Sequence, residues 1–295
     1  MRAVLFAILA VTGCDRGHSK DQGAPAPATA PKPAPTPTFS DIRATYRTKL
    51  VKHGPSPQPY ENEPPPQGVE RVTYPSGDLQ LVAWYAHPTS DRPVPALIYL
   101  HGGFAFGADD FEVARPFLDA GFAVMTPMLR GENGNPGEFE LYYGELDDAR
   151  AAVRWVRARP EIDPKHLYVF GHSAGGVLAA MLAFYPVNGV RLTGSSGGLY
   201  GTDSFNGLEP FDPSDALERT LRAPALNADQ FEIAHVGFIG VDDVDIQESA
   251  AMALDLSERG HRLLKVIKVE GDHHSSLAPS LQRFLRLARV SLKDP

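Results

Sequence analysis

The sequence contains almost no cysteine and has no apolar run long enough to span a bilayer. Cys14 is the only cysteine among 295 residues, so no disulfide can form within the chain. The apolar run Ala3–Val11 is far shorter than the roughly 20 residues that a membrane-spanning helix needs. Basic residues are outnumbered, 28 Lys and Arg against 36 Asp and Glu, which gives a formal net charge of −8. They are also scattered along the chain, which argues against nucleic acid as a partner.

The first 13 residues are typical of a short secretory signal. Arg2 supplies a positive start, and a brief apolar run follows it. The sequence VTGC, which ends at Cys14, resembles the lipobox of bacterial lipoproteins, in which the cysteine is lipidated. The alternative is an ordinary signal peptide followed by a chance cysteine. We expect lipidation of Cys14, hence a protein of the cell envelope that is lipid-anchored to a membrane on its periplasmic or extracellular side.

Proline, unlike cysteine, is abundant, with 27 residues in the chain. The Pro/Ala tract Gly23–Pro37 cannot build a core and is expected to stay extended as a spacer. A short helix is expected at Asp41–Leu50, and the Pro-rich segment Pro55–Pro66 is expected to lie along the body as a strap. We therefore predict four segments, which are a signal peptide at 1–13, a linker at 14–38, an N-terminal arm at 39–67 and one folded domain at 68–295.

Strand-like and helical patterns alternate through the predicted domain. Two alternating runs, Val69–Tyr74 and Leu79–Ala86, flank a turn and predict an antiparallel hairpin. Continuous apolar runs follow, typical of strands buried on both faces of a mostly parallel sheet, at Ala96–Leu100, Ala123–Thr126, Leu167–Phe170, Val190–Gly194, His235–Ile239 and Leu263–Val269. Helices are expected at Glu145–Arg159, Glu248–Arg259 and Ser275–Val290. The pattern predicts the α/β class, with a twisted, mostly parallel sheet and helices on both faces.

The segment Gly171–Gly175, with sequence GHSAG, matches the pattern G-x-S-x-G. A β-prone run precedes it and the helix-prone run Val177–Ala183 follows it, which is the strand–turn–helix context of a nucleophile elbow. Glycines let neighbouring backbones approach such a tight turn. The helix that begins there directs free N–H groups toward negative charge near Ser173. We therefore predict Ser173 as a nucleophile.

A nucleophilic serine needs a base, and the sequence offers two histidines after the last predicted strand. His273 and His274 lie where sheet-based sites collect, at the carboxyl end of a buried strand. A metal site built from them and Asp272 is disfavoured, because adjacent residues rarely point at one ion. No metal and no cofactor are expected. An acid to orient the histidine could come from the loop after His235–Ile239, which carries Asp242, Asp243 and Asp245.

Stabilising a developing oxyanion requires backbone N–H donors. One donor is expected from Ala174, which follows the predicted nucleophile. The other is expected from the loop at 101–104, with sequence HGGF, which resembles the HGG-type oxyanion motif of esterases. Phe104 replaces the familiar third glycine, so Gly103 and Phe104 both remain candidates for the second donor. In a later Gly-rich loop, Arg130 is expected to make structural ion pairs.

Together these motifs resemble the α/β-hydrolase superfamily, and within it the prolyl-oligopeptidase and dienelactone-hydrolase-like esterases. The resemblance covers the chain from about Val69 to its end, and it implies the α/β-hydrolase fold and the chain order serine, acid, histidine. The pattern Gly-x-x-Asp-x-x-apolar in such proteins falls on Asp243, and Gly-x-His falls on His273. The resemblance therefore favours Ser173, Asp243 and His273 as the catalytic residues.

The implied chemistry is metal-free acyl transfer through an acyl-enzyme on Ser173. We expect a serine hydrolase, best described as a carboxylesterase that cleaves small or medium acyl esters. A prolyl-oligopeptidase-like peptidase or acyl-peptide hydrolase is the second expectation. A tethered binding protein that has lost catalysis is the third. The expected partners are a small-molecule ester or short peptide and a membrane, reached through Cys14.

Overall fold

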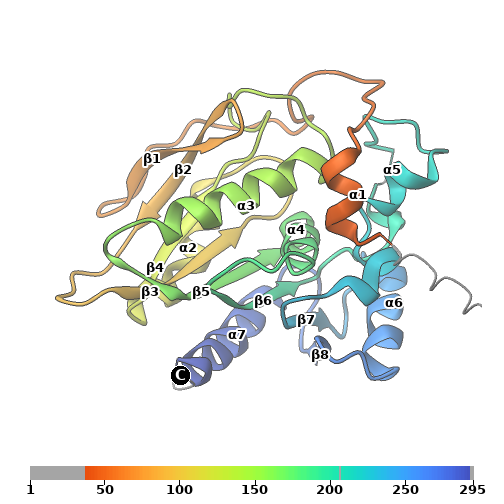
Figure 1. Cartoon of the computed structure of the whole chain (residues 1–295). Coiled ribbons are helices and arrows are strands. Elements are labelled where there is room, and N and C mark those ends of the chain that lie inside the picture. Colours follow the sequence, from red (N-terminus) through yellow and green to blue (C-terminus); the bar gives the residue numbers. More distant parts are fainter. Residues whose placement is uncertain (1–36, 206, 293–295) are drawn as a thin grey trace, which may run out of the picture. The chain divides into compact units, whose positions relative to one another are not determined.

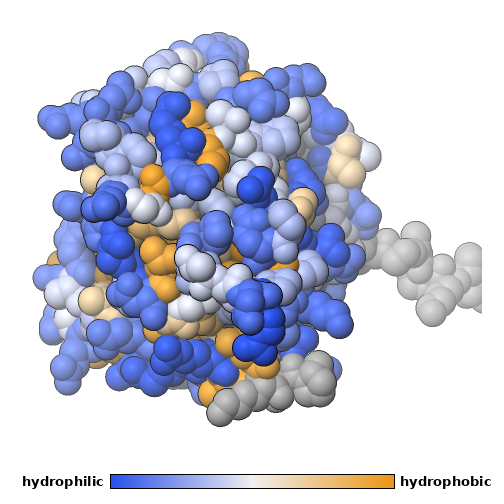
Figure 2. Space-filling view, turned by 90° about the vertical axis from the view of Figure 1, so that its left-hand side faces the viewer, coloured by the Kyte–Doolittle hydropathy of each residue, from blue (hydrophilic) through white to orange (hydrophobic). Residues whose placement is uncertain are grey.

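The computed structural model describes residues 37–205 and 207–292. The predicted signal peptide, Cys14 and the linker as far as residue 36 lie outside the described residues. Among the described helices, none is both long and apolar enough to cross a membrane. Figure 2 shows one face of the molecule, on which hydrophilic side chains predominate and apolar ones form small separate patches.

A single eight-stranded sheet, in the order β1-β2-β4-β3-β5-β6-β7-β8, forms the centre of the described domain (Figure 1). Its strands are β1 Glu70–Ser76, β2 Leu79–Ala86, β3 Val94–Leu100, β4 Ala123–Pro127, β5 Ile162–His172, β6 Val190–Ser196, β7 His235–Gly240 and β8 Leu264–Val269. The pairs β1–β2 and β2–β4 are antiparallel, and every other pair in the sheet is parallel. The hairpin and all six later strands are present where the sequence predicted them.

Helices cover both faces of this sheet. The α-helices are α1 Phe39–Thr45, α2 Ala108–Asp119, α3 Tyr143–Arg157, α4 Ala174–Leu182, α5 Ala216–Thr220, α6 Gln247–Glu258 and α7 Leu277–Ser291, with short 3₁₀ helices at η1 Thr202–Phe205 and η2 Pro224–Gln230. Along β3, Ile98 and Leu100 pack in the same core cluster as α3 and α4, whereas Leu97 and Tyr99 pack with α2 and α7. The alternation follows from the two-residue period of a strand, and it confirms the predicted α/β class.

Two local features differ from the sequence expectation. Helix α2 was not among the predicted helices, and Pro116 lies inside it. Burial of Phe111 and Phe117 on one face of α2 compensates for the backbone hydrogen bond that Pro116 cannot donate. The short helix expected at Asp41–Leu50 is present as α1 but ends at Thr45. The residues after it bond to distant parts of the chain instead, and this tertiary pairing competes with helix formation.

The N-terminal arm lies against the domain along its length. Leu50 forms a β-bridge with Phe211. Further along, the Ser56 N–H donates to the carbonyl of Gly131 at 3.0 Å. Beyond it, a carboxylate oxygen of Glu63 accepts the N–H of Ala108, the first residue of α2, at 2.7 Å. These attachments place the segment from Gln58 to Glu63 beside the loops that follow β3 and β5.

Candidate active site

Ser173 lies at a tight turn between β5 and α4. Its φ of 51° and ψ of −115° are rare for a residue with a side chain, as expected of a nucleophile elbow. A Cβ on Gly171 would lie 2.0 Å from the carbonyl oxygen of Gly175, and one on Gly175 would lie 2.2 Å from that of Leu100. Glycine is therefore required at both positions. The Ser173 N–H donates to the carbonyl of Ser196 at 2.9 Å, which holds the turn against β6.

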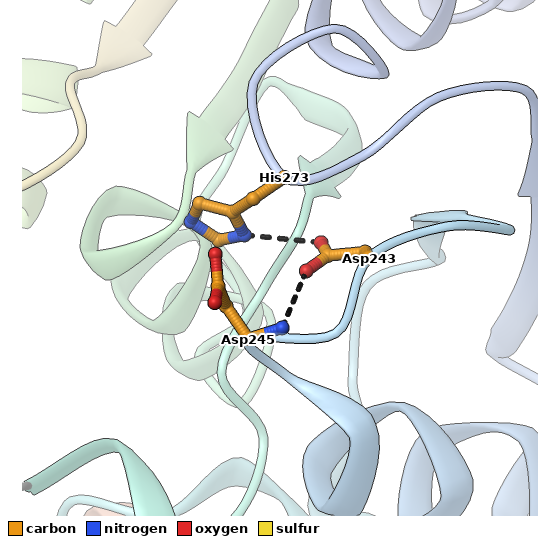
Figure 3. Close-up of side chains that lie close together, drawn as sticks. All are labelled: Asp243, Asp245 and His273. Carbon is orange, nitrogen blue, oxygen red and sulfur yellow. Dashed lines mark hydrogen bonds and ion pairs between the residues drawn. The ribbon is translucent and has the colours of Figure 1, made fainter.

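A histidine and a carboxylate complete a hydrogen-bonded chain with Ser173. His273 Nε2 lies 2.9 Å from Ser173 Oγ. Its Nδ1 lies 3.0 Å from Asp243 Oδ2, the contact drawn in Figure 3. The Asp243 side chain is fully buried and can only accept, so it selects the tautomer with the proton on Nδ1. The unprotonated Nε2 is then an acceptor for the serine hydroxyl. The structure thus brings Ser173, Asp243 and His273 together, from loops that follow β5, β7 and β8.

The other candidates for the base and the acid, His274, Asp242 and Asp245, do not bond to Ser173 or His273 through their side chains in the described structure. His274 is exposed, and its ring centre lies 5.4 Å from that of His273. Asp242 is exposed as well. The Asp245 carboxylate lies beside the His273 ring (Figure 3), and its backbone N–H donates to Asp243 Oδ1 at 3.2 Å. Asp245 therefore helps to fix the Asp243 carboxylate, while Asp243 makes the bond to the histidine.

Asp243, Asp245 and His273 also form a group whose ligand-type atoms lie within 4.8 Å of one another. A metal ion there would need a lone pair on His273. Its Nδ1 already faces Asp243 and its Nε2 already faces Ser173, so an ion would have to break one of these bonds. The hydrogen bonding of the group fits proton transfer better than metal binding.

His172, the second residue of the GHSAG motif, links the two loops beside the serine. Its Nε2 donates to the backbone carbonyl of His273 at 2.9 Å. Its Nδ1 would lie 2.8 Å from a Cβ on Gly102, so the ring packs against the loop at 101–104. Burial lowers the pKa of His172 to about 4, so the ring is neutral at neutral pH. A neutral ring here adds no positive charge next to His273.

His101 holds the start of the loop at 101–104 through two hydrogen bonds of its buried ring. Its Nε2 lies 3.1 Å from Glu132 Oε2, and both side chains are buried. Burial opposes a charge on the ring, but the Glu132 carboxylate outweighs it and raises the pKa of His101 to about 9. The charged ring also donates from Nδ1 to the Gly102 carbonyl at 3.0 Å. His101 is thus a buried ionic support of the loop.

The predicted oxyanion donors come from two segments, the start of α4 and the loop after β3. Ala174 is the first residue of α4, where N–H groups have no acceptor within the helix. In the loop after β3, Gly103 adopts a φ of +66°. The Phe104 N–H donates to Oε1 of Gln58 in the arm at 2.8 Å. Gln58 has no signal in the sequence, because no local pattern connects it to a loop 46 residues away.

An open cleft of about 560 Å³ lies in front of the serine. Ser173, His273 and His274 line it, together with residues of the arm from Gln58 to Glu63 and, from the loop after β3, Gly102, Gly103 and Ala105–Gly107. Arg130 lies away from this cleft and makes the expected ion pairs, with Asp148 at 2.8 Å and Glu140 at 2.7 Å. The arm is therefore part of the wall of the site.

Residues 83–204 of the chain match the family BD-FAE. An uncharacterized protein of Mycobacterium tuberculosis is 31% identical over 127 residues, which are 43% of this chain and 45% of that protein. The chain thus matches less than half the length of this relative.

Among solved structures, a puromycin-hydrolyzing peptidase of Mycobacterium tuberculosis superposes with a TM-score of 0.61 and 21% identity, over 75% of this chain and 39% of that one. An inhibited esterase B of Lactobacillus rhamnosis superposes with a TM-score of 0.60 and 17% identity, over 79% and 90% of the two chains. Sheet order, helix layers and these likenesses agree that the chain has the α/β-hydrolase fold.

Proposed function

We propose that this protein is a serine hydrolase, and specifically a carboxylesterase that acts on small or medium acyl esters. The observation that carries the proposal is the hydrogen-bonded chain from Ser173 through His273 to Asp243, with the serine held at a positive φ. A structural serine at a strand-to-helix turn needs neither a histidine at 2.9 Å nor a buried carboxylate behind that histidine.

Acylation begins when Ser173 Oγ attacks the ester carbonyl and His273 Nε2 takes the serine proton. Asp243, bonded to Nδ1, stabilises the resulting imidazolium. The carbonyl oxygen becomes an oxyanion, which the Ala174 N–H and an N–H of Gly103 or Phe104 stabilise. As the intermediate collapses, the bond to the leaving oxygen breaks and His273 returns its proton to that oxygen. An alcohol leaves, and the acyl group stays on Ser173.

Deacylation repeats these steps with water as the nucleophile. His273 Nε2 takes a proton from water, whose oxygen attacks the acyl carbonyl. The bond to Ser173 Oγ then breaks, and the proton on His273 passes to that oxygen. A carboxylic acid is released and the free serine is restored. His172 stays neutral and adds no second positive charge, so the Asp243 carboxylate has only the charge of the His273 imidazolium to balance.

The cleft supports a small substrate. Pockets for small molecules usually measure about 300–1,000 Å³, and this cleft of about 560 Å³ lies in that range. The arm narrows it on one side, because residues from Gln58 to Glu63 line its wall. An ester with a short acyl chain fits such a site better than an extended polypeptide.

A panel of aryl esters and aminoacyl amides, with Ser173→Ala as the blank, tests the proposed function. We expect aryl acetates and butyrates to be hydrolysed with a higher kcat/KM than the amides. Faster cleavage of the amides would instead identify a peptidase. If the folded protein cleaves neither class, it is a binding protein that has lost catalysis.

We further propose that Cys14 is lipidated and anchors the enzyme at a membrane surface of the cell envelope. The support is the sequence VTGC after a short apolar run, followed by a Pro/Ala spacer. Cell fractionation tests it. The wild-type protein is expected in the membrane fraction and Cys14→Ser in the soluble fraction, and identical fractionation of the two would contradict the anchor.

A further inference from the structure

The arm holds Phe104 by both of its backbone polar groups. The Phe104 N–H donates to Oε1 of Gln58 at 2.8 Å. The hydroxyl of Ser56 donates to the Phe104 carbonyl. The Gln58 carboxamide also lies tight against the neighbouring residue, since a Cβ on Gly103 would be 2.6 Å from the same Oε1. The oxygen of Gln58 therefore lies over the loop that supplies one of the proposed oxyanion donors.

The backbone around Gln58 is constrained. Pro57 and Pro59 flank it, and proline fixes its own φ and restricts the residue before it. Ser56, bonded to Gly131, and Glu63, bonded to Ala108, fix the segment at both ends. Motion is therefore easiest in the side chain of Gln58, which is exposed to solvent in the cleft that contains Ser173.

We propose a second role for this contact: the Phe104 N–H is the second oxyanion donor, and in the free enzyme the Gln58 carboxamide holds this N–H and must release it when a substrate carbonyl binds. The inference rests on the proposed function. An oxyanion needs donors at roughly 2.7–3.1 Å, and Oε1 of Gln58 already lies at 2.8 Å from the Phe104 N–H. One N–H cannot serve both oxygens at full strength, so Gln58 and the substrate compete for it.

A tethered amide competes more strongly than water. It is held next to the N–H at a high effective concentration by the arm, whereas a water molecule exchanges freely. Substrates with a strongly accepting carbonyl oxygen should displace it most readily. Gln58 would thus lower kcat/KM, by the factor that corresponds to the free energy of one net hydrogen bond.

Two variants that remove the oxygen test the competition. Gln58→Met keeps the length of the side chain and Gln58→Ala removes it. Both are expected to raise kcat/KM for an aryl acetate by about 2- to 10-fold, the range that corresponds to one net hydrogen bond. Gln58→Glu should lower it, because a charged acceptor binds the N–H more tightly and repels the oxyanion. Gln67→Met, on the same arm but outside the cleft lining, is the matched control and should leave kcat/KM unchanged.

Whether kcat/KM rises or falls in the neutral Gln58 variants distinguishes competition for the N–H from structural support of the loop. If Gln58 only held the loop in place, both neutral variants would lower kcat/KM, and that result or an unchanged rate would overturn the proposal. Phenylboronic acid, which places an oxygen in the hole when it adds to Ser173, gives a second measurement. Its inhibition constant should fall in Gln58→Met. Hydrolysis by wild type with no gain in the variants refutes only this inference, whereas no hydrolysis and no boronate binding in any variant refutes the proposed function as well.

Discussion

Ester hydrolysis by Ser173→Ala is expected to fall by about 10⁴-fold or more in kcat, since loss of a catalytic serine removes the acyl-enzyme route. What remains would come from the oxyanion donors acting on water. The alanine Cβ occupies the same strained backbone position as the serine Cβ, so the substitution adds no new strain at φ 51°. The free energy of unfolding should change by less than about 1 kcal/mol.

The measurement is kcat for an aryl acetate, together with thermal unfolding of both proteins. Ser90→Ala, in the exposed loop between β2 and β3, is the control for a lost hydroxyl and should keep full activity. Hydrolysis at the wild-type rate by folded Ser173→Ala would show that another group is the nucleophile.

His273→Ala and His274→Ala are expected to differ by several orders of magnitude. His273 Nε2 lies 2.9 Å from Ser173 Oγ, and no other imidazole is placed to take its proton, within the described residues. Loss of this base should lower kcat by about 10⁴- to 10⁶-fold. His274 is exposed on the cleft wall, so its loss should change kcat by less than about 10-fold.

Pre-steady-state and steady-state rates of the two variants on one aryl ester give the comparison, with the fold of each checked by circular dichroism. A larger loss in His274→Ala than in His273→Ala would contradict the assignment of the base. Equal losses would indicate that the loop after β8 has been disturbed as a whole.

Local sequence patterns were sufficient to predict the elbow and the sheet. The sequence GHSAG between a β-prone and a helix-prone run fits few backbone conformations besides a tight strand-to-helix turn. Gly171 and Gly175 are required there, because a Cβ on either would lie 2.0 or 2.2 Å from a backbone carbonyl oxygen. The carboxyl ends of parallel strands meet at one edge, which explains why loops after β5, β7 and β8 could be expected to converge.

Choices between adjacent residues were harder to predict. His273 and His274 share the same local sequence, and only the three-dimensional path of the loop decides which ring faces Ser173. The same holds for Asp243 and Asp245, where the buried carboxylate bonds to the histidine and the exposed one lies beside it. In both cases the family resemblance favours the residue that bonds in the site, His273 and Asp243, whereas the residue types alone leave the choice open, because burial and side-chain direction decide it.

Contacts between distant segments could not be predicted at all. Gln58 reaches the Phe104 N–H across 46 residues, and the surrounding proline-rich sequence indicates only an extended strap. His172 occupies a variable position of the motif, so its bond to the His273 carbonyl had no signal in the sequence. The parts of the site that tune the proposed reaction therefore come from tertiary structure.

Labelling with a fluorophosphonate probe tests the central claim most directly, because the probe phosphonylates only a serine that is activated as a nucleophile. Mass spectrometry of the folded, labelled protein should find one adduct, on Ser173, and none in Ser173→Ala. Labelling should be much slower in His273→Ala. An adduct on another residue, or a folded wild-type protein that remains unlabelled, would contradict the assignment of Ser173 as the nucleophile of a serine hydrolase.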